Sequence, residues 1–170
     1  MRLLLAFSLA LGTPALAAPP ANPQIDYGGF QALTQDVADY REARLLSWEE
    51  FAAAAKRRGV LLLDARSADA YRDGHIRGAI NLPFTDFTAA SLAKVIGNKD
   101  RPILIYCNNN FRNDRAPVPM KRAELALNIQ TFINLVGYGY PNVRELNEVV
   151  DFNDPRIGWV KGALPAGDPA

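Results

Sequence analysis

The sequence is short of the residues that most often carry redox or metal chemistry. One cysteine, Cys107, and one histidine, His75, stand among 170 residues. A single cysteine cannot form an internal disulfide, and no Cys-x-x-Cys pair is present, which excludes thioredoxin-like dithiol chemistry. Zinc sites of the usual kind draw several ligands from Cys and His. We therefore expect neither a metal site nor a cofactor.

The chain also lacks an excess of charge of either sign and a long apolar run. Its 19 basic and 18 acidic residues are well mixed and give a net charge of +1. Phosphate binding needs a concentrated basic patch, so we expect no nucleic-acid partner. No segment reaches the roughly 20 apolar residues that span a bilayer. The composition, with 49% hydrophobic and 22% charged residues, is typical of a single globular domain.

The first residues have the pattern of a secretory signal peptide. A basic start at Arg2 precedes an apolar run over residues 3–11, and Ala15-Leu16-Ala17 has the small-x-small form of a cleavage site. The alternative, a buried N-terminal helix, is disfavoured by the proline-rich segment that follows. We expect residues 1–17 to be removed and the protein to be exported, most simply to a bacterial periplasm, with no membrane partner after cleavage.

The rest of the chain alternates between predicted strands and helices. Residues 18–44 are predicted to be a tether and N-terminal extension, with a short helix over 30–43. Ser47 and Glu50 have capping-box spacing and predict a helix that Gly59 closes. Apolar strands are predicted at 60–64, 78–83, 102–107 and 142–146, and helices at 68–73, 87–98 and 121–139. This pattern predicts a three-layer α/β fold with a mainly parallel central sheet flanked by helices.

Two reactive side chains end predicted strands. Asp64 follows the first apolar strand, and Cys107 ends the strand "ILIYC". The carboxyl ends of parallel strands share one edge of the sheet, which is where ligands bind in such folds. We expect both side chains at that edge.

Three segments resemble rhodanese-like domains. "LLLDARSADAYRDGHIRGAINLP" is similar to the N-terminal signature of that family, "ILIYC" with its short loop resembles the active-site strand, and "GYGYPNVREL" resembles the segment after the active-site helix. The resemblance covers residues 45–165, which leaves 166–170 as a tail. It implies a sulfurtransferase whose cysteine accepts a sulfane sulfur as a persulfide and passes it to a nucleophile.

The loop after Cys107 is expected to hold the residue as an accessible, ionised thiol. Main-chain N–H groups around a sulfur stabilise the reactive thiolate, and asparagine tolerates the backbone angles of a tight cradle. Arg112 adds a positive charge for the thiolate and for a small anionic donor such as thiosulfate. The substrate-binding residues that we expect are Asn108, Asn109, Asn110, Phe111 and Arg112.

Loop length separates two chemistries within the resemblance. Six residues from the cysteine to Arg112 are typical of rhodaneses, whereas related phosphatases and arsenate reductases use seven that end in arginine, and Asn113 stands there. Asn110 replaces a common glycine. The segment 113–119 is an insertion, after which we expect a delayed helix that starts near Met120, too far for its dipole to act clearly on Cys107.

The resemblance assigns supporting roles to three other residues. Asp64 and Arg66 are expected to hold neighbouring loops by hydrogen bonds, and His75 to be a buried packing residue. Nothing in the sequence links His75 to Cys107, which disfavours a Cys-His protease.

Two functions of different class remain. The first is an exported sulfurtransferase with a thiol or protein as acceptor. The second, suggested by the insertion, is a non-catalytic or repurposed module that binds a partner protein. A phosphatase or arsenate reductase is a weaker third.

Overall fold

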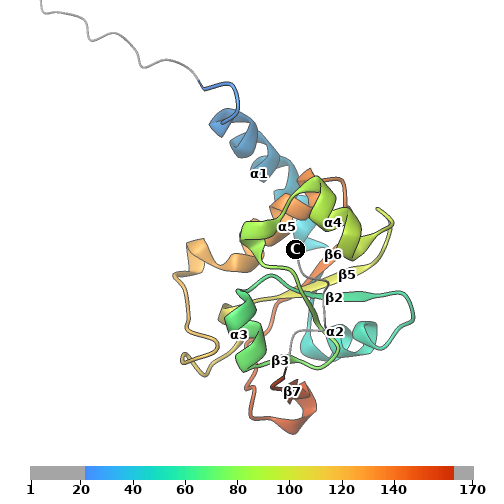
Figure 1. Ribbon diagram of the computed structural model, residues 1–170, viewed down its shortest axis with the longest axis vertical. Helices are drawn as coiled ribbons and strands as arrows, with labels where there is room; N and C mark the ends of the chain where they lie inside the picture. Colours follow the sequence, from blue (N-terminus) through green and yellow to red (C-terminus); the bar gives the residue numbers. More distant parts are fainter. Residues whose placement is uncertain (1–21, 163–170) are drawn as a thin grey trace, which may run out of the picture.

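A five-stranded parallel sheet forms the centre of the molecule (Figure 1). The computed structural model describes residues 22–162, so the expected signal peptide and tail lie outside the described part. In order across the sheet, the strands are β1 (Leu45–Leu46), β6 (Val143–Leu146), β5 (Ile103–Tyr106), β2 (Leu61–Asp64) and β4 (Ile80–Asn81).

Helices cover both faces of this sheet, which confirms the predicted three-layer α/β fold (Figure 1). The helices are α1 (Tyr27–Glu42), α2 (Trp48–Ala55), α3 (Ala68–Asp73), α4 (Ala89–Ile96) and α5 (Leu127–Gly137). One face packs against α1, α4 and α5, and the other against α2 and α3. Within residues 22–162, no helix is both long and apolar enough to cross a membrane.

A second, two-stranded sheet lies beside α3. It pairs β3 (His75–Ile76) with β7 (Trp159–Val160) in antiparallel fashion. The strand at 143–146 is therefore not the last one, contrary to our prediction. A strand is recognised in a sequence by apolar and polar residues that alternate over several positions. The strand that contains Trp159 has two residues, which are too few to form that pattern.

Alternate residues of the central strands feed two separate cores. Leu62 and Leu104 face α2 and α3, where they pack with Phe51 and Tyr71. Because neighbouring side chains of a strand point to opposite faces, Leu61 and its counterparts face the other way. This explains why the predicted strands are apolar throughout.

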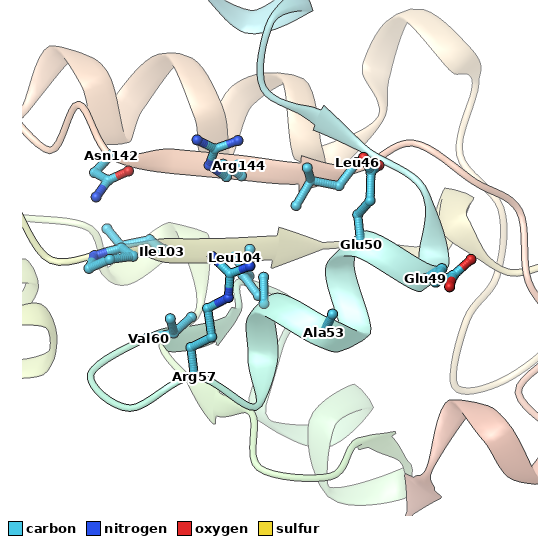
Figure 2. A pocket seen from close by; sticks show the side chains of 12 residues that line it. Leu46, Glu49, Glu50, Ala53, Arg57, Val60, Ile103, Leu104, Asn142 and Arg144 are labelled. Carbon is cyan, nitrogen blue, oxygen red and sulfur yellow. The ribbon is translucent and has the colours of Figure 1, made fainter.

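The face of the sheet that α2 covers contains a groove of about 610 Å³, which lies beside α2 (Figure 2). Val60, Pro102 and Asn142 line it, and they immediately precede β2, β5 and β6. The groove therefore lies at the amino ends of the strands. Cys107 follows the carboxyl end of β5, at the opposite edge.

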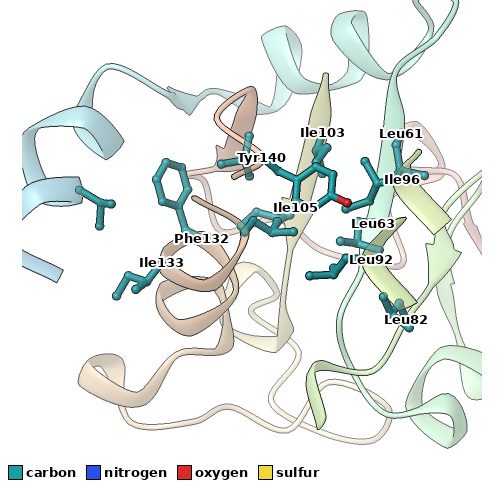
Figure 3. Close-up of a cluster of buried hydrophobic side chains, with 13 residues drawn as sticks. Leu61, Leu63, Leu82, Leu92, Ile96, Ile103, Ile105, Phe132, Ile133 and Tyr140 are labelled. Atoms are coloured by element: carbon teal, nitrogen blue, oxygen red, sulfur yellow. The ribbon is translucent and has the colours of Figure 1, made fainter. Parts of the chain in front are cut away.

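The other core lies under α1, α4 and α5 (Figure 3). Its centre includes Ile105 of β5, Leu92 of α4 and Phe132 of α5, none more than 1% exposed. Val37 of α1 joins this core, and Leu33 packs against it. The N-terminal extension is thus part of the folded domain from residue 27 onward, three residues earlier than the predicted helix.

The predicted capping box at the start of α2 is confirmed. The Ser47 hydroxyl accepts a hydrogen bond from the Glu50 N–H, and a Glu50 carboxylate oxygen accepts one from the Ser47 N–H at 2.9 Å. The helix ends at Ala55, earlier than predicted, and Gly59 adopts a φ of +87° in the turn that follows. A glycine suits that turn because it adopts positive φ without steric strain.

The prediction of a helix starting near Met120 is wrong. A 3-10 turn occupies residues 123–125, α5 begins at Leu127, and Leu125 is 55% exposed. The insertion is fixed before the helix can start, because Val118 is fully buried and the Pro119 carbonyl accepts a hydrogen bond from the Asn108 side chain at 2.9 Å. The chain therefore crosses the loop after β5 before it turns into α5.

Candidate functional site

Cys107 lies at the end of β5 and faces the α1 and α5 side of the sheet. Ile103 and Ile105 belong to the core on that side, and Cys107 follows at the same two-residue spacing. The residue is only 1% exposed, yet it lines a cavity of about 200 Å³. The expectation of an openly accessible thiol is therefore wrong, and the cavity is the space that the residue faces.

The N-terminus of α5 points at this sulfur. Main-chain N–H groups of Asn128, Asn109 and Leu127 donate to Cys107 and lower its pKa. The N-cap residue of α5, Ala126, offers no side-chain acceptor, so the sulfur takes the place of a capping group. The insertion thus moves the start of the helix along the sequence without removing its positive end from Cys107.

Most of the expected loop cradle does not form. The Asn110 N–H donates to the Cys107 carbonyl, that of Phe111 to the Asn108 carbonyl, and that of Arg112 to the Val150 carbonyl. The N–H groups of Phe111 and Arg112 are therefore unavailable to the sulfur. Residues 108–110 form a 3-10 turn in which the Asn110 N–H also faces the Cys107 side chain.

Phe111 and Arg112 are not placed where substrate binding would require them. The Phe111 ring is fully buried on the α2 and α3 side of the sheet, where it packs edge-on against Trp159. Arg112 lines a separate surface hollow with Asp151 and Asp154. A loop of six residues thus begins on one face of the sheet and ends on the other, which the count alone did not reveal.

The three asparagines have three different roles. The Asn108 side chain lies in another cavity of about 470 Å³, on the far side of the loop. Asn109 lines the Cys107 cavity and exchanges hydrogen bonds with the main chain of Lys121. Asn110 is buried, accepts from the Cys107 N–H at 2.9 Å and donates to the carbonyls of Leu146 and Glu148.

Burial raises the pKa of the Cys107 thiol above its usual value. The main-chain donors from Asn128, Asn109 and Leu127 oppose this effect without cancelling it, and the negative charge of Glu145 adds to it. The thiol is therefore protonated at rest near neutral pH. Our prediction of an ionised thiol at rest is wrong, because burial of the sulfur outweighs the main-chain donors.

Glu145 and Arg41 also line the cavity, and sequence reasoning missed both. Glu145 is 4% exposed on β6, beside Ile105 in the register of the sheet. Arg41 of α1 binds both of its carboxylate oxygens, at 2.6 and 2.7 Å. Asn128 donates to Glu145 at 3.2 Å and to Asn110 at 3.0 Å. A continuous polar network therefore joins the N-terminal extension to the Cys107 backbone.

One signal in the sequence was available for Glu145. It stands near the carboxyl end of the predicted strand "NVREL", just as Asp64 ends its own strand. Arg41 gave no comparable signal, because it lies in a helix 104 residues away in the chain. Only the packing of α1 on α5 reveals that it reaches the site.

Asp64 and Arg66 share the carboxyl edge with Cys107 but lie on the opposite face. The Asp64 carboxylate accepts from the Arg66 guanidinium and from the Tyr106 hydroxyl, the latter at 2.6 Å. Arg66 also donates to the carbonyls of Gly74 and Pro117, at 2.7 and 3.2 Å. The pair therefore ties the insertion and the turn after α3 to the sheet.

His75 is equally remote from the thiol. It is buried in β3, its ring stacks on Tyr71 with centroids 3.7 Å apart, and its Nδ1 atom lies 2.8 Å from the Tyr71 carbonyl. Among residues 22–162, no three His, Cys, Asp or Glu side chains are grouped so as to hold a metal ion.

Comparisons with known proteins agree with this architecture. A model of the family described as "Rhodanese-like domain" matches residues 47–148. The Bacillus subtilis (strain 168) protein YqhL, described as uncharacterized, is 30% identical over 86 residues, which cover 51% of this chain and 64% of that protein. The chain thus spans somewhat under two thirds of that relative.

The chain is also similar to solved structures. "Rhodanese with anions from E. coli" is 23% identical with a TM-score of 0.42, and the match covers 61% of this chain and 99% of that one. The Rhodanese_3 like domain of the Anabaena protein Alr3790 is 22% identical with a TM-score of 0.44, covering 61% and 93%.

Proposed function

Because the chain belongs to the rhodanese-like domain family, we propose that it is a sulfurtransferase that carries a sulfane sulfur as a persulfide on Cys107. The observation that carries this proposal is the position of the sole thiol. It lines a cavity in which three main-chain N–H groups, two of them from the first turn of α5, converge on the sulfur.

The reaction takes two steps. In the first, the Cys107 thiolate attacks the outer sulfur of a donor, a new S–S bond forms, and the bond between the donor's sulfur and the rest of the donor breaks. In the second, a thiol acceptor, free or on a protein, attacks that outer sulfur and regenerates Cys107. Splitting the transfer in this way is covalent catalysis by an activated nucleophile.

The buried thiol calls for activation during binding. The N–H groups of Asn128, Asn109 and Leu127 stabilise negative charge on the sulfur once the proton leaves. They stabilise the terminal sulfur anion of the persulfide in the same way. The N-terminus of α5 therefore stabilises negative charge on the sulfur, a role that the N–H groups of Phe111 and Arg112 do not perform.

The test is the mass of the protein after treatment with a sulfane sulfur donor. We expect the wild type to gain one sulfur atom on Cys107 and a thiol acceptor to remove it. Cys107→Ser, which preserves the size of the side chain, gains nothing. If the wild type gains no more mass than Cys107→Ser after treatment with thiosulfate and with a persulfide, the proposal is wrong.

A second candidate, a module that binds a partner protein, is favoured by one observation. Cys107 is 1% exposed and the amides of residues 110–112 are satisfied within the chain, as expected of a site that performs no chemistry. The same mass measurement separates the two functions, because a binding module acquires no sulfur that a thiol can remove.

We further propose that the protein works outside the cytoplasm. The support is the signal-peptide pattern of residues 1–17. Expression in a bacterial host followed by intact-mass analysis of the periplasmic fraction should give a chain that begins at Ala18. A full-length chain confined to the cytoplasmic fraction would contradict the proposal.

A further inference from the structure

We propose that the Cys107 cavity takes its sulfur from an organic persulfide that bears at most one negative charge on its sulfur atoms, and that it discriminates against the thiosulfate dianion. This inference rests on the proposed sulfurtransferase function. It names the class of donor for the same site, and it follows from the charges, the size and the leaving group that the cavity accommodates.

The walls of the cavity carry a net negative charge. Among the described residues that line it, three are charged: Arg41, Glu145 and Glu148. Glu145 accepts hydrogen bonds from two of the three nitrogens of the Arg41 guanidinium, at 2.6 and 2.7 Å, so the charges of this pair offset each other inside the site. Glu148 then leaves the walls with a formal charge of −1, and the remaining polar walls are neutral amides and a thiol.

The cations that could draw a dianion lie elsewhere. Arg112 lines a separate hollow with Asp151 and Asp154. Lys121 lines the cavity on the far side of the loop, and the exposed Arg122 lies 3.6 Å from Glu124. None of these three is among the residues that line the Cys107 cavity. A doubly charged donor would therefore approach a negative surface without an unpaired cation to receive it.

The size of the cavity restricts what enters it. About 200 Å³ is smaller than the roughly 300–1,000 Å³ of sites that enclose a drug-sized ligand. The sulfur end of a donor fits, whereas a large organic remainder stays outside. A terminal –S–SH group on a small molecule or on a protein cysteine satisfies this requirement equally well.

The leaving group supports the same donor class. The thiolate of Cys107 attacks the outer sulfur of R–S–SH, the S–S bond of the donor breaks, and the departing thiolate takes up the proton that Cys107 lost. Overall, Cys107–SH and R–S–SH give Cys107–S–SH and R–SH, with no oxidant and no net charge. Thiosulfate would instead leave sulfite, which brings a second multiply charged anion into the negative cavity.

Two variants that alter the same ion pair in opposite ways test this inference. The measurement is the rate at which Cys107 gains one sulfur atom from cysteine persulfide and from thiosulfate, followed by mass spectrometry. We expect the wild type to react faster with the persulfide. Glu145→Gln frees the Arg41 charge and should raise the thiosulfate rate relative to the persulfide rate by about tenfold, and Arg41→Gln should lower it by a similar factor.

Opposite shifts distinguish charge from structural damage. Both variants break the same pair, so damage alone would move the two ratios in the same direction. Glu49→Gln removes the same charge from an exposed position on α2 and should leave the ratio unchanged. A persulfidated protein as a third donor identifies the source: loading from it points to a protein carrier, and loading from cysteine persulfide alone points to a small one.

The outcomes separate this inference from the proposed function. If the wild type gains sulfur from neither donor, the proposed function fails and the inference fails with it. If the wild type reacts with thiosulfate at least as fast as with the persulfide, or if both variants shift the ratio in one direction, only the donor class is overturned and the sulfurtransferase proposal stands.

Discussion

At the scale of single residues, the reactivity of Cys107 is a balance between opposing groups. Burial and the Glu145 carboxylate favour the thiol, whereas the N–H groups of Asn128, Asn109 and Leu127 favour the thiolate. Arg41 moderates the carboxylate by binding both its oxygens. Because burial has the largest effect on the pKa, the resting state of Cys107 is the neutral thiol. The N–H donors act mainly on the thiolate and the persulfide anion, which appear during reaction.

This balance predicts the pH dependence of alkylation. A raised pKa means that the thiolate fraction of Cys107 at neutral pH is smaller than that of an exposed cysteine, whose pKa is about 8.5. The rate of alkylation by iodoacetamide should therefore rise with pH. The midpoint of this rise should lie above about 8.5 in the folded protein and near that value in urea. Cys107 is the only cysteine, so total alkylation reports it directly. A folded-state midpoint at or below pH 7 would contradict the prediction.

Asn110 should matter for stability much more than its neighbour Asn109. The buried Asn110 side chain accepts from the Cys107 N–H and donates to two carbonyls of the β6 loop, so Asn110→Ala leaves several buried groups without partners. We expect a loss of about 2–3 kcal/mol in the free energy of unfolding, measured by urea denaturation.

Asn109→Ala is the matched control for that variant. Its side chain makes two hydrogen bonds, but they are exposed bonds to the main chain of Lys121. Water replaces such partners, so the loss should stay within about 1 kcal/mol. Equal losses for the two variants would mean that Asn110 does not hold the loop in the way described.

At the scale of elements, the sequence predicted those whose signals are local. The capping box at Ser47 and the apolar run of β2 were sufficient to identify α2 and its neighbouring strand. The start of α5 was not predictable, because Ala126 lacks a capping side chain and the helix begins where its N–H groups meet the sulfur of residue 107. That acceptor comes from a distant strand, and no local pattern records it.

A substitution that loosens α1 should leave the central sheet intact. Val37 is the α1 side chain buried in the core, at 4% exposure. Val37→Ala should cost about 2 kcal/mol, and α1 amides should exchange faster with solvent while those of β2 and β5 keep their protection. Hydrogen-exchange mass spectrometry measures both. Gln35→Ala, at an exposed position of the same helix, should leave the exchange of α1 unchanged or slower.

At the scale of the whole molecule, the carboxyl edge of the sheet carries two separate polar systems. Cys107, Glu145 and Asn128 lie on the α1 and α5 side, and Asp64 and Arg66 lie with Tyr106 on the α2 and α3 side. The shared edge was predictable from the parallel order of strands. The division between faces follows from the alternation of side chains, which assigns residues 64 and 107 to opposite sides once the register is known.

The burial of the only thiol should keep the molecule free of disulfide-linked dimers under oxidising conditions. Two Cys107 side chains cannot approach each other, because each is 1% exposed at a cavity of about 200 Å³ and a disulfide needs Cα atoms within about 7 Å. Treatment with diamide followed by non-reducing electrophoresis should leave a monomer. Ala90→Cys in a Cys107→Ser background places the single thiol on an exposed helix position and should give a dimer under the same conditions. If the wild type dimerised as fast as this control, the Cys107 thiol would have to be as exposed as a thiol on a helix surface, and its burial in the cavity would be contradicted.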